Sequence, residues 1–342
     1  MLRLLYTTLL LLTLLSYSAQ WLVPNEGFSL ALLGLLSPAF WGLTLLATGL
    51  AGWRSSRWGW AGVLVLLLGS TMLRSTFAWS LTETVDGASI RLASFNANSL
   101  IITTGRANQN RQDTTIARFI QSLDADILCI QEYRYKHAER LTTAIQGLTG
   151  FKYLHRDGRS RLILFSRYPL ANGRTTHLPN NETNGYQQIQ VATPLGPIHL
   201  CNIHLQTNAI TQLAASIREQ PLASEAQTKQ RFTTLAKRYT NTNRSRTQQV
   251  RGILADISTV KLPTILCGDF NDVPQTYLYR LVRRQFQDAH LAAGWGLGAT
   301  YEKLLPWLRI DYILPDPSFK IVDFERFPCP FSDHHAIVAT MQ

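Results

Sequence analysis

The stretch TILCGDFN at residues 264–271 decides the fold of this 342-residue chain. Its apolar, β-prone first half predicts a buried strand, and polar residues close it. Because side chains two apart on a strand share a face, Asp269 and Asn271 point one way and Gly268 and Phe270 the other. Functional sites are often built from polar side chains where rigid strands give way to loops. The stretch therefore predicts a site at one edge of a sheet.

Other expected strands also begin or end in polar side chains. These are Asn96 and Asn98 in Ile90–Asn98, Glu132 in Asp126–Glu132, Asn202 and His204 in Ile198–Leu205, Asp311 in Arg309–Leu314, and Asp333 and His334 before Ala336–Met341. Alternation puts Asn202 and His204 on one face and sets Gln131 opposite Glu132. Polar groups thus collect where strands end and loops begin.

Helix-like segments alternate with these strands. Thr114–Leu123 and Ala138–Leu148 have a helical period in the first half, and Gln275–Arg284 has one in the second. A long, polar, helix-prone stretch, Thr211–Thr259, lies between them. Early and late strands with helices between them predict an α/β sandwich, in which two sheets have helices on their outer faces.

The N-terminal region has a different composition. From Leu2 to Leu81 the only charged residues are Arg3, Glu26, Arg54, Arg57 and Arg74. Three apolar runs, Leu4–Val23, Phe28–Trp53 and Trp58–Leu73, are candidates for spanning helices, which need roughly 20 residues. The third run reaches that length only if it continues to Trp79.

This composition predicts an integral protein of the cell membrane. We expect a transmembrane region of about three helices at 1–80, a linker at 81–89 and a catalytic domain at 90–342. The alternative for the first run is a cleavable signal peptide. Arg3 and the loop with Arg54 and Arg57 are expected on the cytoplasmic side, so three spans put the catalytic domain outside the cytoplasm. An interfacial third run would reverse that side.

The charge of the chain is unevenly distributed. The formal charge is +11, and the N-terminal region contributes +3 of it through four arginines and Glu26. Much of the remaining excess lies between Arg218 and Arg251. This cluster is interpreted either as a solvated helix face or as a collector of polyanions or anionic lipid head groups. The four cysteines lack metal-site spacing and are expected to be buried free thiols.

The polar residues at the strand ends suit metal-assisted hydrolysis of a phosphate ester. Glu132 is suited to hold a hard divalent cation, most plausibly Mg²⁺. Asp269 can orient or deprotonate the attacking water, while Asn96 and Asn271 can donate hydrogen bonds to phosphate oxygens.

An imidazole completes this chemistry. His334 can act as an acid, a base or a phosphate ligand, with Asp311 fixing its tautomer. Strand parity places His199 opposite His204, so His199 is expected to be structural.

Six short motifs in this order resemble the endonuclease/exonuclease/phosphatase superfamily. They are Asn96, Gln131-Glu132, Asn202-Ile203-His204, Gly268-Asp269-Phe270-Asn271, Arg309-Ile310-Asp311-Tyr312 and Ser332-Asp333-His334, and the resemblance covers Ile90 to the C-terminus. It implies a four-layer α/β sandwich and Mg²⁺, with Mn²⁺ as the alternative. The implied roles are metal binding by Glu132, Asn96 and Asp333, phosphate contact by His204 and His334, service to the nucleophile and transition state by Asp269 and Asn271, and pairing of Asp311 with His334.

The resemblance predicts hydrolysis of phosphoesters by a phosphodiesterase, nuclease or phosphatase anchored in a membrane. A phospholipid or sugar-phosphate hydrolase of sphingomyelinase type is the first alternative, and a non-catalytic polyanion-binding domain is the second. Asn98 stands where some nucleases carry an acidic residue, which argues against a second metal. The expected partners are a phosphate-ester substrate (nucleic acid, phospholipid or sugar phosphate) and the membrane, with no protein partner predicted.

Overall fold

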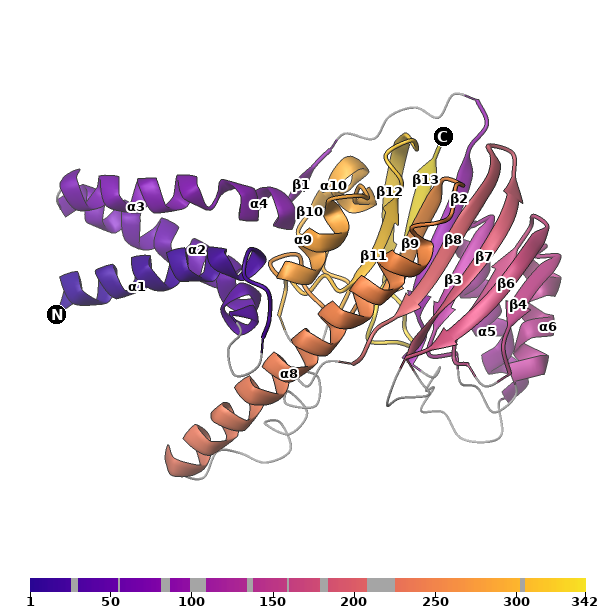
Figure 1. Ribbon diagram of the computed structural model, residues 1–342, viewed down its shortest axis with the longest axis horizontal. Coiled ribbons are helices and arrows are strands. Elements are labelled where there is room, and N and C mark those ends of the chain that lie inside the picture. The colour runs from indigo at the N-terminus through magenta and orange to yellow at the C-terminus, as the bar shows by residue number, and fades with distance from the viewer. Residues whose placement is uncertain are drawn as a thin grey trace. The chain divides into compact units, whose positions relative to one another are not determined.

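The computed structural model in Figure 1 describes most of the chain. The described residues are 1–25, 30–54, 56–80, 87–98, 109–133, 138–158, 160–178, 184–207, 225–301 and 305–342. Most of the expected linker at 81–89 and the Arg218 end of the basic cluster lie outside them.

The chain forms two compact units. The sandwich unit comprises Ala78–Thr207, Ile253–Asn271 and Gln285–Gln342. The helical unit comprises Met1–Phe77, Asn208–Gly252 and Asp272–Arg284. Besides the N-terminal region, the helical unit therefore contains two segments from the part of the sequence expected to be catalytic.

Two β-sheets form the sandwich unit. The six-stranded sheet has the order β12 (Ile321–Phe327), β13 (Ala336–Met341), β2 (Ile90–Asn96), β3 (Ile127–Gln131), β5 (Ile163–Ser166) and β4 (Tyr153–Arg156). The five-stranded sheet has the order β11 (Asp311–Pro315), β9 (Thr264–Asp269), β8 (Gly196–His204), β7 (Gly185–Thr193) and β6 (Leu170–His177). A short pair, β1 (Ala78–Trp79) and β10 (Trp295–Gly296), stands apart from both sheets.

Strand alternation builds two hydrophobic cores. Ile90 and Leu92 of β2 lie in one core with Ile265 and Cys267 of β9, so this core fills the space between the sheets. Ala93 and Phe95, on the opposite face of β2, lie in a second core that includes residues of α5 (Gln109–Ser122) and α6 (Ala138–Thr149). The last turn of α8 (Glu225–Ile257) contacts the other sheet, where Asp256 accepts hydrogen bonds from Tyr186 and Gln188. The predicted α/β class, two sheets flanked by helices, is confirmed.

The directions of the strands place the predicted site residues of both sheets on the same side of the sandwich. In the two sheets, β2 runs parallel to β3, and β8 runs parallel to β9. The strands β11 and β13 are antiparallel to β9 and β2, so their first residues lie beside the last residues of those strands. All the predicted polar positions are therefore at one end of the sandwich.

The N-terminal part of the helical unit is an apolar bundle. It contains α1 (Leu2–Tyr17), the short η1 (Ser18–Gln20), α2 (Ala31–Arg54), α3 (Ser56–Leu68) and α4 (Ser70–Thr76). Polar contacts join the helices at two levels: the hydroxyls of Thr13 and Thr44 are 2.8 Å apart, and the Tyr6 hydroxyl lies 3.1 Å from that of Thr48. The helices α9 (Tyr277–Arg283) and, in the sandwich unit, α10 (Ala289–Ala293) complete the described helices.

Two of these helices, Leu2–Gln20 and Ala31–Gly52, are long and apolar enough to cross a membrane. The apolar helix Arg57–Leu68 is shorter, and the third predicted span is divided between α3 and α4 at Gly69. A signal sequence also satisfies the criteria of length and composition, so the membrane anchor stays a prediction.

Candidate active site

Two aspartates from neighbouring strands form the centre of the site. Asp269 ends β9, Asp311 begins β11, and the antiparallel register makes them direct partners. Both are almost fully buried, with exposures of 1% and 2%. Burial and the charge of Asp311 raise the pKa of Asp269 to about 6, although His334, His204 and a hydrogen bond from Asn96 act in the opposite direction. Asp269 is thus a carboxylate poised close to neutral pH.

The residue before Asp269 has to be glycine. Gly268 has φ +130°, and a Cβ there would collide with the carbonyl oxygen of Ile203 on the adjacent strand β8. Only glycine combines that backbone conformation with so close an approach. The glycine therefore allows β9 to pack beside β8 and brings Asp269 next to His204, its register partner.

His334 is held against Asp311. Its Nδ1 lies 2.9 Å from Asp311 Oδ2, and its Nε2 lies 4.0 Å from Asp269 Oδ2. Burial lowers the pKa of His334, but the charge and hydrogen bond of Asp311 and the charges of Asp269 and Asp333 raise it to about 10. The imidazole consequently carries a positive charge at neutral pH.

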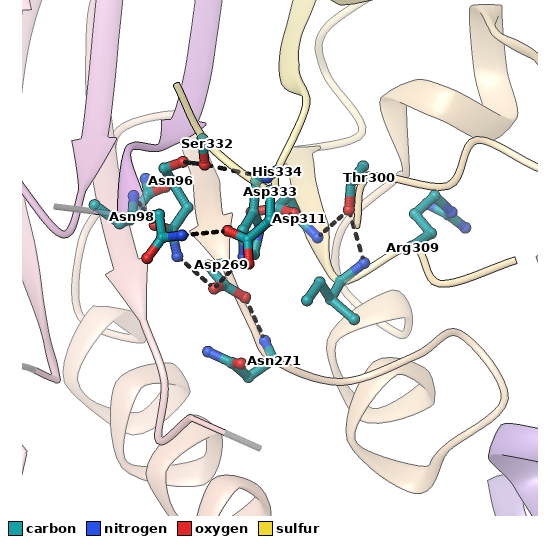
Figure 2. Close-up of polar contacts among 12 residues, drawn as sticks. Asn96, Asn98, Asp269, Asn271, Thr300, Arg309, Asp311, Ser332, Asp333 and His334 are labelled. Carbon is teal, nitrogen blue, oxygen red and sulfur yellow. Dashed lines mark hydrogen bonds and ion pairs between the residues drawn. The ribbon is translucent and has the colours of Figure 1, made fainter. Parts of the chain in front are cut away.

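A serine fixes the loop that carries this histidine. Ser332 Oγ accepts a hydrogen bond from the backbone N–H of His334 at 3.1 Å and donates one to the carbonyl of Asn96 at 2.7 Å (Figure 2). The contact ties the segment before β13 to the end of β2.

Asn96 connects the two sheets. Its Nδ2 donates to Asp269 Oδ2 at 2.8 Å and to Glu132 Oε1 at 3.4 Å. His204 Nε2 lies 3.5 Å from the same Glu132 oxygen and 3.9 Å from Asp269 Oδ2. Asn96, Glu132 and His204 are thus brought together with Asp269, as predicted from the strand ends.

Glu132 reaches this position through its backbone. Gln131 follows the strand alternation and points between the sheets, where its Nε2 donates to Asn202 Oδ1 at 2.7 Å. Regular alternation would turn Glu132 away from that face. Its φ of +54° ends the alternation and allows the carboxylate to reach Asn96. A non-glycine residue in this region stores strain, which is frequent at functional sites.

Asp333 joins the site through Asn98. Asn98 Nδ2 donates to Asp333 Oδ1 at 2.7 Å, and the backbone N–H of Asn98 donates to Asn96 Oδ1 at 2.9 Å (Figure 2). Asn98 also has a positive φ, +42°. The amide that replaces an acidic residue here therefore holds Asp333, while the backbone N–H of the same residue holds the side-chain oxygen of Asn96.

Asn271 lies in the loop after β9. The strand ends at Asp269, two residues earlier than expected, and Asn271 has a left-handed φ of +52°. Its backbone N–H donates to Asp269 Oδ1 at 2.7 Å, and its Nδ2 donates to the carbonyl of Leu205 at 3.1 Å. In the structure Asn271 therefore orients Asp269 through its backbone.

Sequence reasoning missed two residues of the site, Thr300 and Tyr301. Thr300 Oγ1 accepts hydrogen bonds from the backbone N–H groups of Ile310 and Asp311 at 3.0 and 3.1 Å. The Tyr301 ring packs edge-on against His334 with centroids 5.1 Å apart, and burial and Asp333 raise the pKa of its hydroxyl. The two lie outside the regular strands of the sheets, so periodicity gives no signal for them.

Two groups of side chains could hold a cation. Ligand atoms of Asp269, Asp311 and His334 all lie within 4.8 Å of one another. Glu132, Asn96 and Asp333 are a second group, joined by hydrogen bonds of Asn96 and Asn98, and they offer carboxylate and amide oxygens. Hard divalent cations such as Mg²⁺ prefer oxygen ligands, so the second group fits such an ion by its chemistry.

Buried acidic groups and imidazoles at one end of an α/β sandwich define a candidate phosphoester hydrolase, and comparison with known proteins supports this class. The sequence model of the Endonuclease/Exonuclease/phosphatase family matches residues 93–334. The chain therefore belongs to this family, and the resemblance predicted from its motifs is confirmed. No curated protein sequence gives a significant match.

Several solved structures share the fold. An endonuclease/exonuclease/phosphatase from Beutenbergia cavernae is 17% identical with a TM-score of 0.52, over 74% of this chain and 71% of that one. D. rerio TDP2, solved with a single-strand DNA product, is 14% identical with a TM-score of 0.52, over 75% of this chain and all of that one. A family protein from Bacteroides thetaiotaomicron is 16% identical with a TM-score of 0.50, over 74% and 95%. These matches do not support the sphingomyelinase-type alternative.

Proposed function

We propose that this chain is a metal-dependent phosphodiesterase anchored in a membrane. The observation that carries the proposal is the position of Asp269, whose Oδ2 accepts a hydrogen bond from Asn96 and lies 4.0 Å from Nε2 of the charged His334. A carboxylate and an imidazolium side by side at one end of the sandwich are the two groups that in-line attack of water on a phosphate ester requires.

Asp269 is the group that prepares the nucleophile. With a pKa of about 6, it is ionised at neutral pH yet remains a useful base. The backbone N–H of Asn271 fixes one of its oxygens and leaves the other facing Asn96 and the two histidines. A water placed beside this second oxygen can lose a proton to it as attack on phosphorus begins.

His334 stabilises the charge that develops on the phosphate. Asp311 holds its Nδ1, so the charged Nε2–H is the donor available to a phosphate oxygen. His204 lies on the other side of Asp269 and supplies a second contact to the substrate. Both donors are fixed before substrate binds, which favours electrostatic stabilisation of the transition state.

Glu132 and Asn96, with Asp333, are the residues that would hold the divalent cation, which we propose to be Mg²⁺, with Mn²⁺ as a substitute. The ion would neutralise phosphate oxygens and so lower the barrier to attack. The protein orients the side-chain oxygens that would bind the ion. Asn98 fixes Asp333 and Asn96, and the left-handed backbone directs the Glu132 carboxylate.

Nucleic acid is the substrate class that we place first. The support is the family match together with D. rerio TDP2, a structural relative solved with a single-strand DNA product. Phosphomonoesters and small phosphodiesters are also tested as substrates, because the same side chains can act on their phosphate groups.

The apolar helices support the anchor. Many leucines on α1 to α3 are exposed, among them Leu4, Leu11, Leu46, Leu64 and Leu67. A water-soluble protein rarely exposes so many large apolar side chains in neighbouring helices, whereas lipid would cover them. We further propose three spans at 1–80, with the catalytic domain at 90–342 outside the cytoplasm.

The full chain, purified in neutral detergent, tests the proposed chemistry. We expect Mg²⁺-dependent hydrolysis of bis(p-nitrophenyl) phosphate and of a single-stranded oligonucleotide, slower hydrolysis of p-nitrophenyl phosphate, and no turnover in EDTA. Hydrolysis of the monoester alone would exclude a phosphodiesterase. Turnover that persists in EDTA and disappears in none of the site variants would exclude the proposed site.

The proposed orientation has its own test. The described cysteines are buried, so a Lys237→Cys variant adds one exposed thiol on α8. An impermeant maleimide should label it in intact cells or spheroplasts. Labelling only after the membrane is opened would place the domain on the cytoplasmic side.

A further inference from the structure

The two units differ completely in charge. The helical unit contains 15 lysines and arginines and four acidic residues, a formal charge of +11, which equals that of the whole chain. The remaining 18 basic residues of 33 and 18 acidic residues of 22 belong to the sandwich unit, which is formally neutral. The basic character of the protein is therefore a property of the helical unit and not of the unit that contains the candidate active site.

This positive charge has little compensation within the unit. Of its four acidic residues, Asp272 is the one whose side chain the structure describes. Asp272 is buried, 3.7 Å from the guanidinium of Arg246, and accepts a hydrogen bond from Asn243 at 2.8 Å. Its charge is thus used internally, beside the buried Arg246.

The segment with α9 is fixed to one end of the apolar bundle. Gln275 Nε2 donates to Thr76 Oγ1, the last residue of α4, at 2.6 Å. The carbonyl of Gln275 packs so closely on Gly34, in the first turn of α2, that a Cβ there would collide with it. These contacts hold α9 where α2 begins and α4 ends.

At the same end, arginines alternate with aromatic and apolar side chains. The Arg280 guanidinium lies over the ring of Trp21, which directly follows η1 and is 57% exposed. Leu22 and Val23, next in sequence, are 48% and 46% exposed. Tryptophan beside exposed apolar residues and arginine is typical of the boundary between the bilayer core and the head groups.

Two further arginines extend this surface. Arg251 of α8 donates to the Tyr277 hydroxyl at 3.2 Å, and Arg284, just after α9, is exposed. Arg280 and Arg284 are four residues apart, so their like charges repel. Burial and the charge of Arg284 lower the pKa of Arg280, and Tyr277 has a smaller, opposite effect.

We propose that Arg251, Arg280 and Arg284, with the exposed tip Trp21-Leu22-Val23, bind the phosphate head groups of anionic phospholipids at the membrane surface. The proposal rests on the membrane anchor of the proposed function. It adds a lipid-binding surface, of which Arg280 and Arg284 follow the loop of Asp269 and Asn271 in the chain. The exposed apolar tip favours a lipid surface over nucleic acid, because a phosphate backbone in water offers nothing to cover leucine and valine.

Lipid retention by the full chain tests this surface. The wild-type chain in neutral detergent is mixed with equal amounts of dioleoyl phosphatidylglycerol and dioleoyl phosphatidylcholine, and the retained lipids are counted by native mass spectrometry. We expect a clear preference for phosphatidylglycerol that falls about fivefold for each arginine replaced in Arg251→Gln and Arg284→Gln. The matched control, Arg118→Gln with Lys261→Gln on the exposed surface of the sandwich unit, should keep the preference.

Other outcomes would overturn the proposal. Equal retention of the two lipids by the wild type, or an unchanged preference in the arginine variants, excludes the surface. Loss of oligonucleotide binding with an intact lipid preference assigns the arginines to nucleic acid instead. The assay needs neither turnover nor metal, so it is independent of the proposed hydrolysis. Alkaline extraction of cell membranes tests the anchor separately.

Discussion

The candidate active site has two halves that are built in different ways. The acid–imidazole half comprises Asp269, Asp311 and His334. Antiparallel strand register pairs the two aspartates, His334 lies in the segment before β13, and all three are buried. The oxygen half comprises Asn96, Asn98, Glu132 and Asp333, and two of these residues, Asn98 and Glu132, have left-handed backbone conformations. The first half is buried, whereas in the second Asn98, Glu132 and Asp333 are partly accessible and lie just beyond the strands.

This difference separates two tasks. Proton transfer and charge stabilisation need groups with fixed pKa values, which burial and neighbouring charges provide at Asp269 and His334. Cation binding needs oxygens that the ion and its waters can reach. We therefore expect replacements in the acid–imidazole half to reduce turnover at saturating metal, and replacements in the oxygen half to raise the metal requirement.

The largest effect is expected at His334. His334→Asn removes the cation beside Asp269 and should lower kcat by about 10³-fold at saturating Mg²⁺. Steady-state hydrolysis of bis(p-nitrophenyl) phosphate measures it. His199→Asn, at an equally buried position toward the opposite end of β8, is the matched control and should retain turnover. Equal losses in both variants would mean that the effect is structural.

Asp311→Asn should have a smaller effect, about 10²-fold in kcat. Asp311 raises the pKa of His334, so its removal lowers that pKa and the imidazole loses its proton at a lower pH. The alkaline limb of the kcat/KM profile, near pH 10 in the wild type, should move toward neutrality. An unmoved alkaline limb would contradict the assignment, and Asp316→Asn at the far end of β11 controls for charge.

Glu132→Gln should change the metal requirement. Without this carboxylate, the Mg²⁺ concentration for half-maximal activity should rise about 100-fold, and high Mg²⁺ should restore most of the turnover. A metal titration of hydrolysis measures this change. Glu139→Gln on the exposed face of α6 should titrate as the wild type does. Loss of turnover that excess metal does not restore would show that Glu132 acts in the chemical step, with the acid–imidazole half, and not in metal binding.

Asn98→Ala should show the smallest effect, a rise of about tenfold in the same Mg²⁺ concentration, because it removes only the amide that orients Asp333 and keeps the backbone N–H that bonds Asn96. Asn172→Ala controls for the backbone, since Asn172 also has a positive φ, +52°, but lies on β6. If both variants change equally, the strained conformation and not the hydrogen bonds explains the result.

The same division explains what the sequence could predict. In the acid–imidazole half, polar strand ends predict that Asp269 and Asp311 lie at the site, and the structure places His334 2.9 Å from Asp311 and 4.0 Å from Asp269. The strand end also predicts Glu132 at the site, but alternation does not predict the positive φ that turns its side chain to Asn96. Thr300 and Tyr301 left no periodic signal at all.

The fold shows a similar limit. Alternating apolar runs predict the two sheets and their flanking helices, because burial on each face imposes a period on the sequence. The grouping of Asp272–Arg284 and the basic part of α8 with the N-terminal helices has no such period. It depends on single contacts between residues far apart in the chain, such as Gln275 with Thr76.

The most direct test of the account is the turnover of Asp269→Asn in the full chain. At saturating Mg²⁺, with Asp126→Asn as the folded control, we predict a loss of about 10³-fold or more in the hydrolysis of bis(p-nitrophenyl) phosphate and an unchanged melting temperature in detergent. Turnover within about tenfold of the wild type would show that Asp269 does not prepare the nucleophile, and it would contradict the proposed mechanism.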